Sequence, residues 1–162
     1  MNAIRILITG GTFDKEYDEI RGCLFFKETH LSEMLKLGRC ERPLQTQTLM
    51  MVDSLDMGEG EREKIAKAAK ESVEAHLVIT HGTDTMTTTA EYLANAKIDK
   101  TIVLTGAMIP YKFGSSDGLF NLGSAIAYAD LLPKGVYIAM NGRYFEWDKV
   151  AKDRSLGRFV SK

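Results

Sequence analysis

Three clusters of small and hydroxyl-bearing residues each come directly after a short apolar run of the sequence. Thr9-Gly10-Gly11-Thr12 follows the first run, residues 80–85 follow a later one, and residues 105–108 follow the next. Neighbouring glycines let the backbone turn sharply and bring its N–H groups close to a ligand. A hydroxyl at the next position suits a nucleophile beside an oxyanion hole, so Thr12 is a candidate nucleophile.

Gly-Gly-Thr also has explanations that need no such chemistry. A tight turn at the end of a strand uses the same residues. A phosphate-binding loop also places glycines before a threonine. The spacing opposes that second explanation, because Thr9-Gly10-Gly11-Thr12 fits neither GxxxxGK[ST] nor GxGxxG and no clear helix begins directly after Thr12.

The other polar candidates have ordinary structural explanations as well. Asp84 precedes a helical pattern and fits a helix N-cap. Thr83 and Thr85 fit turn positions, and His81 after an apolar strand fits a packed, hydrogen-bonded residue. Lys152 has no local pattern that distinguishes it from a solvated charge.

The elements that must position these residues alternate along the chain. Short apolar runs between segments of helical period predict an α/β domain with an open, mostly parallel sheet and helices on both faces. Because ligands bind beyond the carboxyl ends of such strands, all three clusters are expected to share one crevice. We expect strands at residues 4–8, 45–50, 77–80, 101–104 and 136–140.

Helices are expected between these strands. Ile65, Ala69 and Val73 form one apolar stripe in a helix predicted over residues 62–75. A short helix over residues 32–37 is expected to close at Gly38. Two further helices are predicted, one over residues 86–94 and one over residues 119–129 that Pro133 ends.

Composition limits the classes of partner. The 162 residues are 44% hydrophobic and 27% charged, which fits one domain over residues 1–162. A formal charge of −1, from 21 basic and 22 acidic residues, gives no excess of positive charge for binding nucleic acid. The apolar runs fall far short of the roughly 20 residues that span a bilayer, so neither a membrane nor secretion is expected. We predict a cytoplasmic protein.

Cysteine and histidine give no sign of a metal or cofactor. Cys23 and Cys40 lack CxxC spacing and are expected to be free thiols, with a disulfide between them as the alternative. His30, His76 and His81 are scattered and have neither HExxH spacing nor carboxylate-rich neighbours. No metal site and no cofactor are predicted.

Together the motifs resemble the L-asparaginase family of the bacterial, threonine-nucleophile type. The resemblance implies a flavodoxin-like sheet equivalent to that family's N-terminal domain. This chain ends soon after Lys152, so we expect the short form that lacks the C-terminal domain. The matching segments run in family order and are Thr9-Gly10-Gly11-Thr12, His81-Gly82-Thr83-Asp84-Thr85-Met86, Gly106-Ala107-Met108, Ser116-Asp117-Gly118, Phe120-Asn121-Leu122 and Val150-Ala151-Lys152.

The resemblance implies catalytic roles for five residues. Thr12 would attack a side-chain amide, release ammonia and form an acyl-threonine ester that water cleaves. Thr83 and Lys152 would relay the proton, although an amine with a reference pKa of about 10.4 must be desolvated to act as a base. Asp84 would bind the α-ammonium group of the substrate. Tyr17 resembles the family's loop tyrosine, in a polar loop that is either a lid or disordered.

Substrate binding is also implied by resemblance. Residues 53–57 resemble the segment that binds the α-carboxylate of the substrate, although Leu55 stands where full-length members usually have Gln. Asp53 and Asp56 fit turn and cap positions as an alternative. The implied substrate-binding residues are Gly11, Asp53, Ser54, Thr83, Asp84 and Ala107.

The leading hypothesis is hydrolysis of L-asparagine to L-aspartate and ammonia. L-Glutamine is a possible side substrate, because one methylene changes binding by only roughly 1–3 kcal/mol. In full-length members of the family a neighbouring subunit's C-terminal domain supplies a glutamate, so weak activity is expected here. Candidate replacements are Glu16, Glu19 or a residue from a differently arranged subunit.

Two other functions are weighed against hydrolysis. The first is a noncatalytic protein that binds asparagine or aspartate. The second is an amidase subunit that acts on a charged tRNA, for which the sequence offers no basic patch. A homo-oligomer is expected from the resemblance. Phe145 and Trp147 are the sequence hint of an interface, and ordinary packing explains them equally well.

Overall fold

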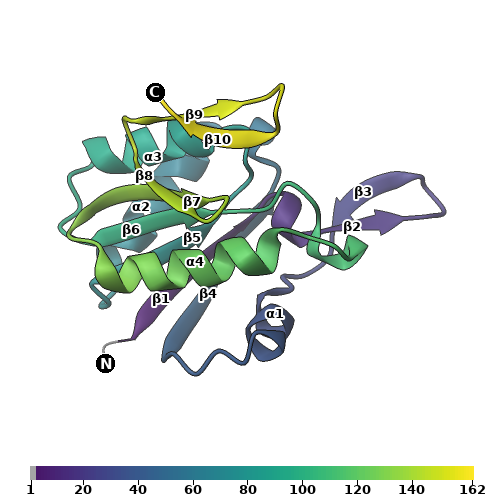
Figure 1. Cartoon of the computed structure of the whole chain (residues 1–162), viewed down its shortest axis with the longest axis horizontal. Helices are drawn as coiled ribbons and strands as arrows, with labels where there is room; N and C mark the ends of the chain where they lie inside the picture. Colours follow the sequence, from purple (N-terminus) through teal and green to yellow (C-terminus); the bar gives the residue numbers. More distant parts are fainter. Residues whose placement is uncertain (1–2) are drawn as a thin grey trace.

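A six-stranded sheet forms the centre of the computed structural model, which describes residues 3–162. Neighbouring strands follow the order β4-β1-β5-β6-β7-β8, as traced in Figure 1. All are parallel except β8, which runs antiparallel to β7. The open, mostly parallel α/β sheet expected from the sequence is therefore confirmed. The strands are β1 Ile4–Gly10, β4 Leu44–Val52, β5 His76–Thr80, β6 Thr101–Thr105, β7 Gly135–Met140 and β8 Arg143–Glu146.

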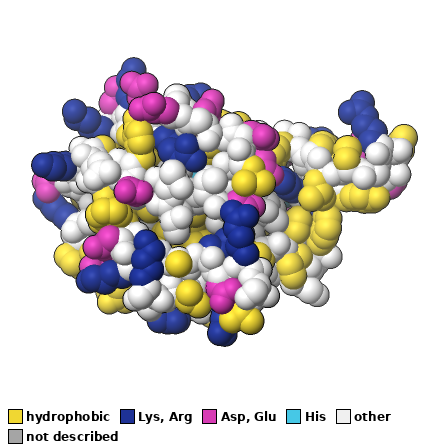
Figure 2. All heavy atoms as spheres, turned by 90° about the horizontal axis from the view of Figure 1, so that it is seen from above, with side chains coloured by type: hydrophobic (Ala, Val, Ile, Leu, Met, Phe, Trp, Pro, Cys, Tyr) yellow, Lys and Arg dark blue, Asp and Glu magenta, His cyan; other side chains and the backbone are white. Residues whose placement is uncertain are grey.

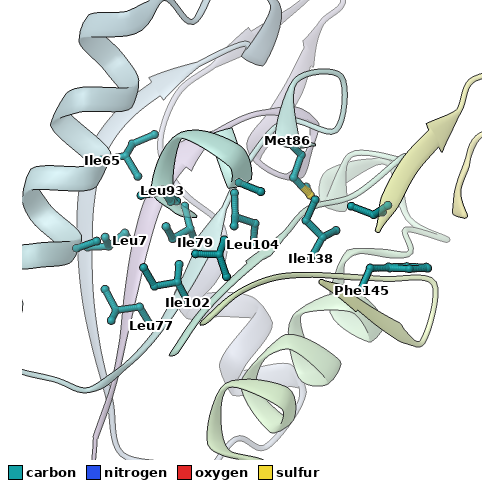
Figure 3. Close-up of a cluster of buried hydrophobic side chains, with 14 of the residues drawn as sticks. Leu7, Ile65, Leu77, Ile79, Met86, Leu93, Ile102, Leu104, Ile138 and Phe145 are labelled. Atoms are coloured by element: carbon teal, nitrogen blue, oxygen red, sulfur yellow. The ribbon is translucent and has the colours of Figure 1, made fainter. Parts of the chain in front are cut away.

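Helices cover both faces of this sheet. Side chains alternate between the faces along each strand. Leu7 packs with Leu77 and Ile79 in one core, whereas Ile6 and Ile8 belong to the other. Figure 3 shows the first core, which the helices α2 and α3 cover. Strands buried on both faces account for the continuous apolar runs in the sequence. The helices are α1 Leu31–Leu37, α2 Glu59–Glu71, α3 Met86–Asn95 and α4 Gly118–Leu131.

The strand order places the topological switch point of the sheet between β1 and β5. Numbered along the chain, the five parallel strands lie in the spatial order 2-1-3-4-5, which is the flavodoxin-like arrangement. After β1 the chain adds β4 on one side of it, and it then adds β5, β6 and β7 on the other side. The order of strands thus reverses between β1 and β5, and ligands bind at such switch points of open α/β sheets. The turns that follow these two strands carry Thr12 and Thr83.

Helix α2 ends earlier than the sequence predicted. Ile65 and Ala69 are fully buried as expected, but Val73 is 91% exposed and lies beyond the helix. The Lys100 amine donates to the backbone carbonyl of Ala69, and also to those of Lys70 and Ser72. A cation at a helix C-terminus binds the free carbonyls there and favours an end at this point.

The segment after Thr12 is an antiparallel hairpin, so the expectation of a loop around Tyr17 was wrong. A single 3₁₀ turn, Thr12–Asp14, leads into strands β2 Lys15–Asp18 and β3 Cys23–Phe26. Tyr17 pairs with Leu24, and the hairpin projects from the body of the protein (Figure 1). The Asp18 carboxylate accepts two backbone N–H groups at the turn, which explains how a polar stretch reverses direction.

The C-terminal part contains strands that the sequence analysis did not predict. β8 follows β7 through a turn at Asn141 and Gly142, and β9 Val150–Asp153 pairs with β10 Arg158–Ser161 in a second hairpin. Phe145 is 4% exposed and lies in the core, with Trp147 packed against it. Packing within the chain therefore accounts for this aromatic pair.

Surface features agree with the near-neutral composition. Basic and acidic side chains are interspersed over the face drawn in Figure 2. Cys23 and Cys40 are exposed free thiols. Within residues 3–162, no helix has both the length and the apolar character needed to cross a bilayer.

The end of α2 gives a direct test of this packing. Ile65→Ala should lower the free energy of unfolding by about 2–5 kcal/mol, because it leaves a cavity between α2 and the sheet. Val73→Ala is the matched control and should change it by less than about 0.5 kcal/mol, since Val73 is exposed. Urea denaturation of both variants measures the difference. Equal losses would show that α2 packs in a different register.

Candidate active site

Turns at the ends of neighbouring strands touch through their backbones. Gly11 has φ 77° and ψ −175°, a conformation that is essentially restricted to glycine. A Cβ atom on Gly11 would lie 2.3 Å from the Gly82 nitrogen, and one on Gly82 would lie 2.6 Å from the Ser54 hydroxyl. A Cβ atom on Gly106 would lie 2.3 Å from the His81 carbonyl oxygen. The three predicted clusters therefore meet at one place beyond the carboxyl ends of the strands, the crevice of the candidate site, with the turn at Ser54 as a fourth member.

Lys152 reaches this crevice from the β9–β10 hairpin. Its Nζ donates to Thr83 Oγ1 at 2.8 Å and to Asp84 Oδ1 at 2.8 Å, across 69 and 68 residues of sequence. The Lys152 side chain is only 12% exposed. Lys149 instead pairs with Glu146 at the surface. The explanation of Lys152 as a solvated charge is therefore wrong.

Thr12 begins the 3₁₀ turn that directly follows Gly11 and is half-buried. The contact between Gly11 and Gly82 brings the backbone at Thr12 beside the turn that carries Thr83. Within residues 3–162 the Thr12 hydroxyl has no hydrogen bond to Thr83 or Lys152. The structure thus assembles Thr83, Asp84 and Lys152 into direct contact and leaves Thr12 as their neighbour.

Tyr17 lies farther out than these residues. It sits on β2 in the projecting hairpin and is 54% exposed, and among the described residues it has no hydrogen bond to Thr12. The base of the same hairpin is tied to the crevice, because Lys15 forms an ion pair with Asp53. Tyr17 therefore approaches the crevice only as part of the hairpin.

Asp53 behaves as a cap residue in the structure. Its carboxylate accepts the Leu55 N–H at 3.0 Å and caps the short turn Ser54–Asp56. Burial raises the pKa of Asp53, but hydrogen bonds from Lys15 and the Leu55 N–H outweigh that effect and hold the pKa below its ordinary value. Asp53 is thus an ionised partner of Lys15. Asp56 lies inside this turn and does not cap α2.

Ser54 is 1% exposed and faces the Gly82 turn. Its hydroxyl accepts the Thr85 N–H at 3.4 Å, and its carbonyl accepts the Thr85 hydroxyl at 2.8 Å. Leu55, by contrast, is 63% exposed. Of the polar side chains in the segment expected to bind a carboxylate, that of Ser54 is buried, whereas Asp53 is half-buried and Asp56 is exposed.

His81 is a packed residue, as the ordinary explanation held. A carbonyl can only accept, so the contact of Nδ1 with the Gly82 carbonyl at 2.7 Å puts the proton on Nδ1. Nε2 then accepts from the Thr89 hydroxyl at 2.8 Å. Burial lowers the pKa of His81 to about 4. The imidazole is therefore neutral near pH 7 and supports the turn before Thr83.

Arg62 is a structural residue of the site that the sequence analysis did not single out. Its guanidinium donates to the hydroxyls of Thr85 and Thr89 at 3.2 Å, and to the carbonyls of Met57 and Gly58 at 3.0 Å. It joins the start of α2 to the first turn of α3. No local signal marks it, because an arginine at the start of a surface helix is ordinary.

The loop after β6 is held by two side chains of the α4 N-terminus. Asp117 accepts the backbone N–H groups of Met108 and Ile109 at 3.0 Å. Asn121 donates from Nδ2 to the Gly106 carbonyl at 2.9 Å. The Ala107 side chain is fully buried in the core, so any ligand contact at this position must come from its backbone.

No cluster of metal ligands accompanies these residues. Within residues 3–162, histidine, cysteine and carboxylate side chains form no group of three or more that is placed to hold a metal ion. The chemistry offered by the crevice is that of hydroxyls, one carboxylate and one amine.

Comparison with known proteins extends the resemblance over the chain. Residues 3–158 match the family model described as "Asparaginase, N-terminal". L-asparaginase 1 of Escherichia coli strain K12 is 30% identical over 167 residues, which cover 96% of this chain and 48% of that protein. The glutaminase-asparaginase of Pseudomonas fluorescens is 35% identical over 102 residues, which cover 60% of this chain and 26% of that protein.

A solved structure from Campylobacter jejuni, described as "Probable Cytoplasmic L-asparaginase", superposes with a TM-score of 0.86 at 31% identity. The match covers 99% of this chain and 53% of that one. This chain therefore spans about half the length of such relatives, and its fold is that of their N-terminal domain.

The contact of Gly11 with Gly82 predicts a large effect of one methyl group. Gly11→Ala should lower the free energy of unfolding by more than about 2 kcal/mol, because alanine disfavours this conformation and its Cβ meets fixed backbone. Gly60→Ala is the control, since Gly60 is an exposed helical residue with open space around it. That change should stabilise the protein by about 0.5–1 kcal/mol. Thermal denaturation of both variants tests the contrast.

The neutral His81 predicts a dependence of stability on pH. The unfolded chain takes up a proton as the pH falls through about 6.5, whereas folded His81 does so only near pH 4. The free energy of unfolding should therefore decline between about pH 7 and pH 4, by about 3 kcal/mol from this group. His81→Asn should have a shallower slope than wild type in urea titrations over this range. Parallel slopes would contradict the assignment.

Proposed function

This chain belongs to the asparaginase family, and from that premise we propose that it hydrolyses L-asparagine to L-aspartate and ammonia. The observation that carries the proposal is the position of the Lys152 amine. It lies 2.8 Å from both the Thr83 hydroxyl and the Asp84 carboxylate, in the crevice beside Thr12. A buried amine next to hydroxyls supports acyl transfer, because a hydroxyl nucleophile needs an acceptor for its proton.

In the proposed reaction Thr12 Oγ1 attacks the carbon of the substrate's side-chain amide. The proton of Thr12 passes to the Thr83 hydroxyl while the proton of Thr83 passes to the Lys152 amine. The amide nitrogen takes up this proton and leaves as ammonia, which leaves an ester on Thr12. Water then attacks the ester, and its cleavage restores the Thr12 hydroxyl and releases the acid.

Asp84 links substrate binding to the contacts of Lys152 in this scheme. In the free protein the Asp84 carboxylate accepts a charge-assisted hydrogen bond from Lys152. An incoming α-ammonium group would compete for the same carboxylate. Lys152 would then lose its anionic partner. Substrate binding at Asp84 would therefore release Lys152 from this ion pair and leave its amine with the Thr83 hydroxyl as its partner.

Substrate choice, assembly and location are parts of the same proposal. L-Glutamine fits as a side substrate, because one extra methylene changes binding by only roughly 1–3 kcal/mol. The Ser54 hydroxyl is the group we assign to the substrate α-carboxylate, since Asp53 is already paired with Lys15. A homo-oligomer and a cytoplasmic location are proposed from the family resemblance, with the Campylobacter jejuni relative as support for the second.

Ammonia release from L-asparagine tests the proposal. Thr12→Ala should abolish turnover, and Lys152→Met should lower kcat by about 10²–10⁴-fold, because it removes the proton acceptor. Thr88→Ala and Lys149→Met are matched controls at exposed positions and should retain wild-type rates. L-Glutamine is assayed in parallel as the second substrate.

Two outcomes would reject hydrolysis by these residues. Turnover that survives unchanged in Thr12→Ala would point to another nucleophile. A wild-type protein that is stabilised against heat by L-aspartate but releases no ammonia would instead be a binding protein.

A further inference from the structure

The hairpin that carries Lys152 is separate from the central sheet. β9 and β10 pair only with each other, whereas the Thr83 turn extends from the middle of the six-stranded sheet. Val150 and Phe159 anchor the hairpin in the core. Apolar contacts of this kind are non-directional, so they do not by themselves fix the position of an amine to the tolerance of a hydrogen bond.

A chain of hydrogen bonds joins this hairpin to the loop after β6. The Phe159 N–H donates to Asn141 Oδ1 at 3.0 Å, and Phe159 is the register partner of Lys152. The Asn141 N–H donates to Asn121 Oδ1 at 3.1 Å. Asn121 in turn holds the carbonyl of Gly106 in the crevice. Two amide side chains thus connect the strand opposite Lys152 to one of the turns that form the site.

We propose that Asn141 is a positioning residue that sets the reach of Lys152 to Thr83 and Asp84. The proposal rests on the proposed function. Directly opposed residues of an antiparallel pair lie about 4.5–5.5 Å apart, so a shift of Phe159 also moves Lys152. Proton transfer requires the base within about 2.6–3.2 Å of its partner. A displacement of about 1 Å can lower a rate about 100-fold.

Asn141 also has an ordinary role that must be separated from this one. Asn141 and Gly142 have φ angles of 58° and 73°, as in a type I′ hairpin turn, where asparagine is common. Asn141 is exposed, so removal of its side chain leaves no cavity. Glycine at this position keeps the turn and removes the acceptor. Aspartate keeps both the turn and an oxygen acceptor.

The kinetic test compares Asn141→Gly with Asn141→Asp. Asn141→Gly should lower kcat about 10- to 100-fold with KM changed less than about threefold, because the base is displaced while Asp84 and Ser54 remain in place. Asn141→Asp should restore kcat to within about threefold of wild type. Arg143→Ala is the control, since it removes a different hydrogen bond to this hairpin, at Ser161. It should leave kcat unchanged.

An amine-labelling test does not depend on activity. Acetic anhydride at limiting concentration, followed by peptide mass spectrometry, reports the exposure of each lysine amine. In wild type Lys152 should react several-fold more slowly than exposed Lys149, because its amine is buried and hydrogen-bonded. Asn141→Gly should raise the labelling of Lys152 several-fold and leave that of Lys149 unchanged, and Asn141→Asp should restore the wild-type pattern.

The two measurements distinguish the proposals from each other. If the wild type releases no ammonia, the proposed function fails, but labelling still decides whether Asn141 positions Lys152. Unchanged labelling in Asn141→Gly, or equal effects of the glycine and aspartate variants, would overturn the role of Asn141. A loss of folding in both variants would also overturn it, because the turn would then account for the residue.

Discussion

The close approach of the Gly11 and Gly82 backbones is the constraint on which the site depends. It exists because β1 and β5 are neighbours in a parallel sheet, so that their carboxyl ends emerge side by side. Thr12 and Thr83, the residues directly after these glycines, therefore start from neighbouring backbone positions. A side chain at Gly11 would force these two turns apart, and one at Gly82 would collide with Ser54.

Two structural units contribute to the site: turns at the ends of the buried central strands, and the separate β9–β10 hairpin. Buried strands carry the turns, and hydrogen bonds of neutral His81 and of the Arg62 guanidinium stabilise the turn at Thr83. The amine of Lys152 arrives on a separate hairpin and binds Asp84. One carboxylate therefore holds the amine in the free protein and is also the group that we propose for a substrate ammonium, which would link occupancy of the site to the position of Lys152.

Local patterns predicted those parts of the fold that depend on burial. Strands covered on both faces appear as apolar runs, and glycine turns mark their ends, so the sheet and the crevice were predictable. The partners of Lys152 lie 68 and 69 residues away, and only family resemblance pointed to them. Asn141-Gly142 after β7 is a known hairpin signal and predicts β8 when it is weighed. The early end of α2 depends on Lys100, which no pattern within the helix reveals.

The hairpin that carries Tyr17 is fixed at its base by buried hydrogen bonds. Fully buried Asp14 accepts the His30 N–H at 2.8 Å and the Thr29 hydroxyl at 3.0 Å, which joins the segments before β2 and after β3. Burial raises the pKa of this carboxyl, and the two hydrogen bonds oppose that rise. Both ends of the hairpin are thus fixed at one point, beside the ion pair of Lys15 and Asp53. Tyr17 is therefore held as part of one paired unit on this base, because β2 and β3 are bonded along their length.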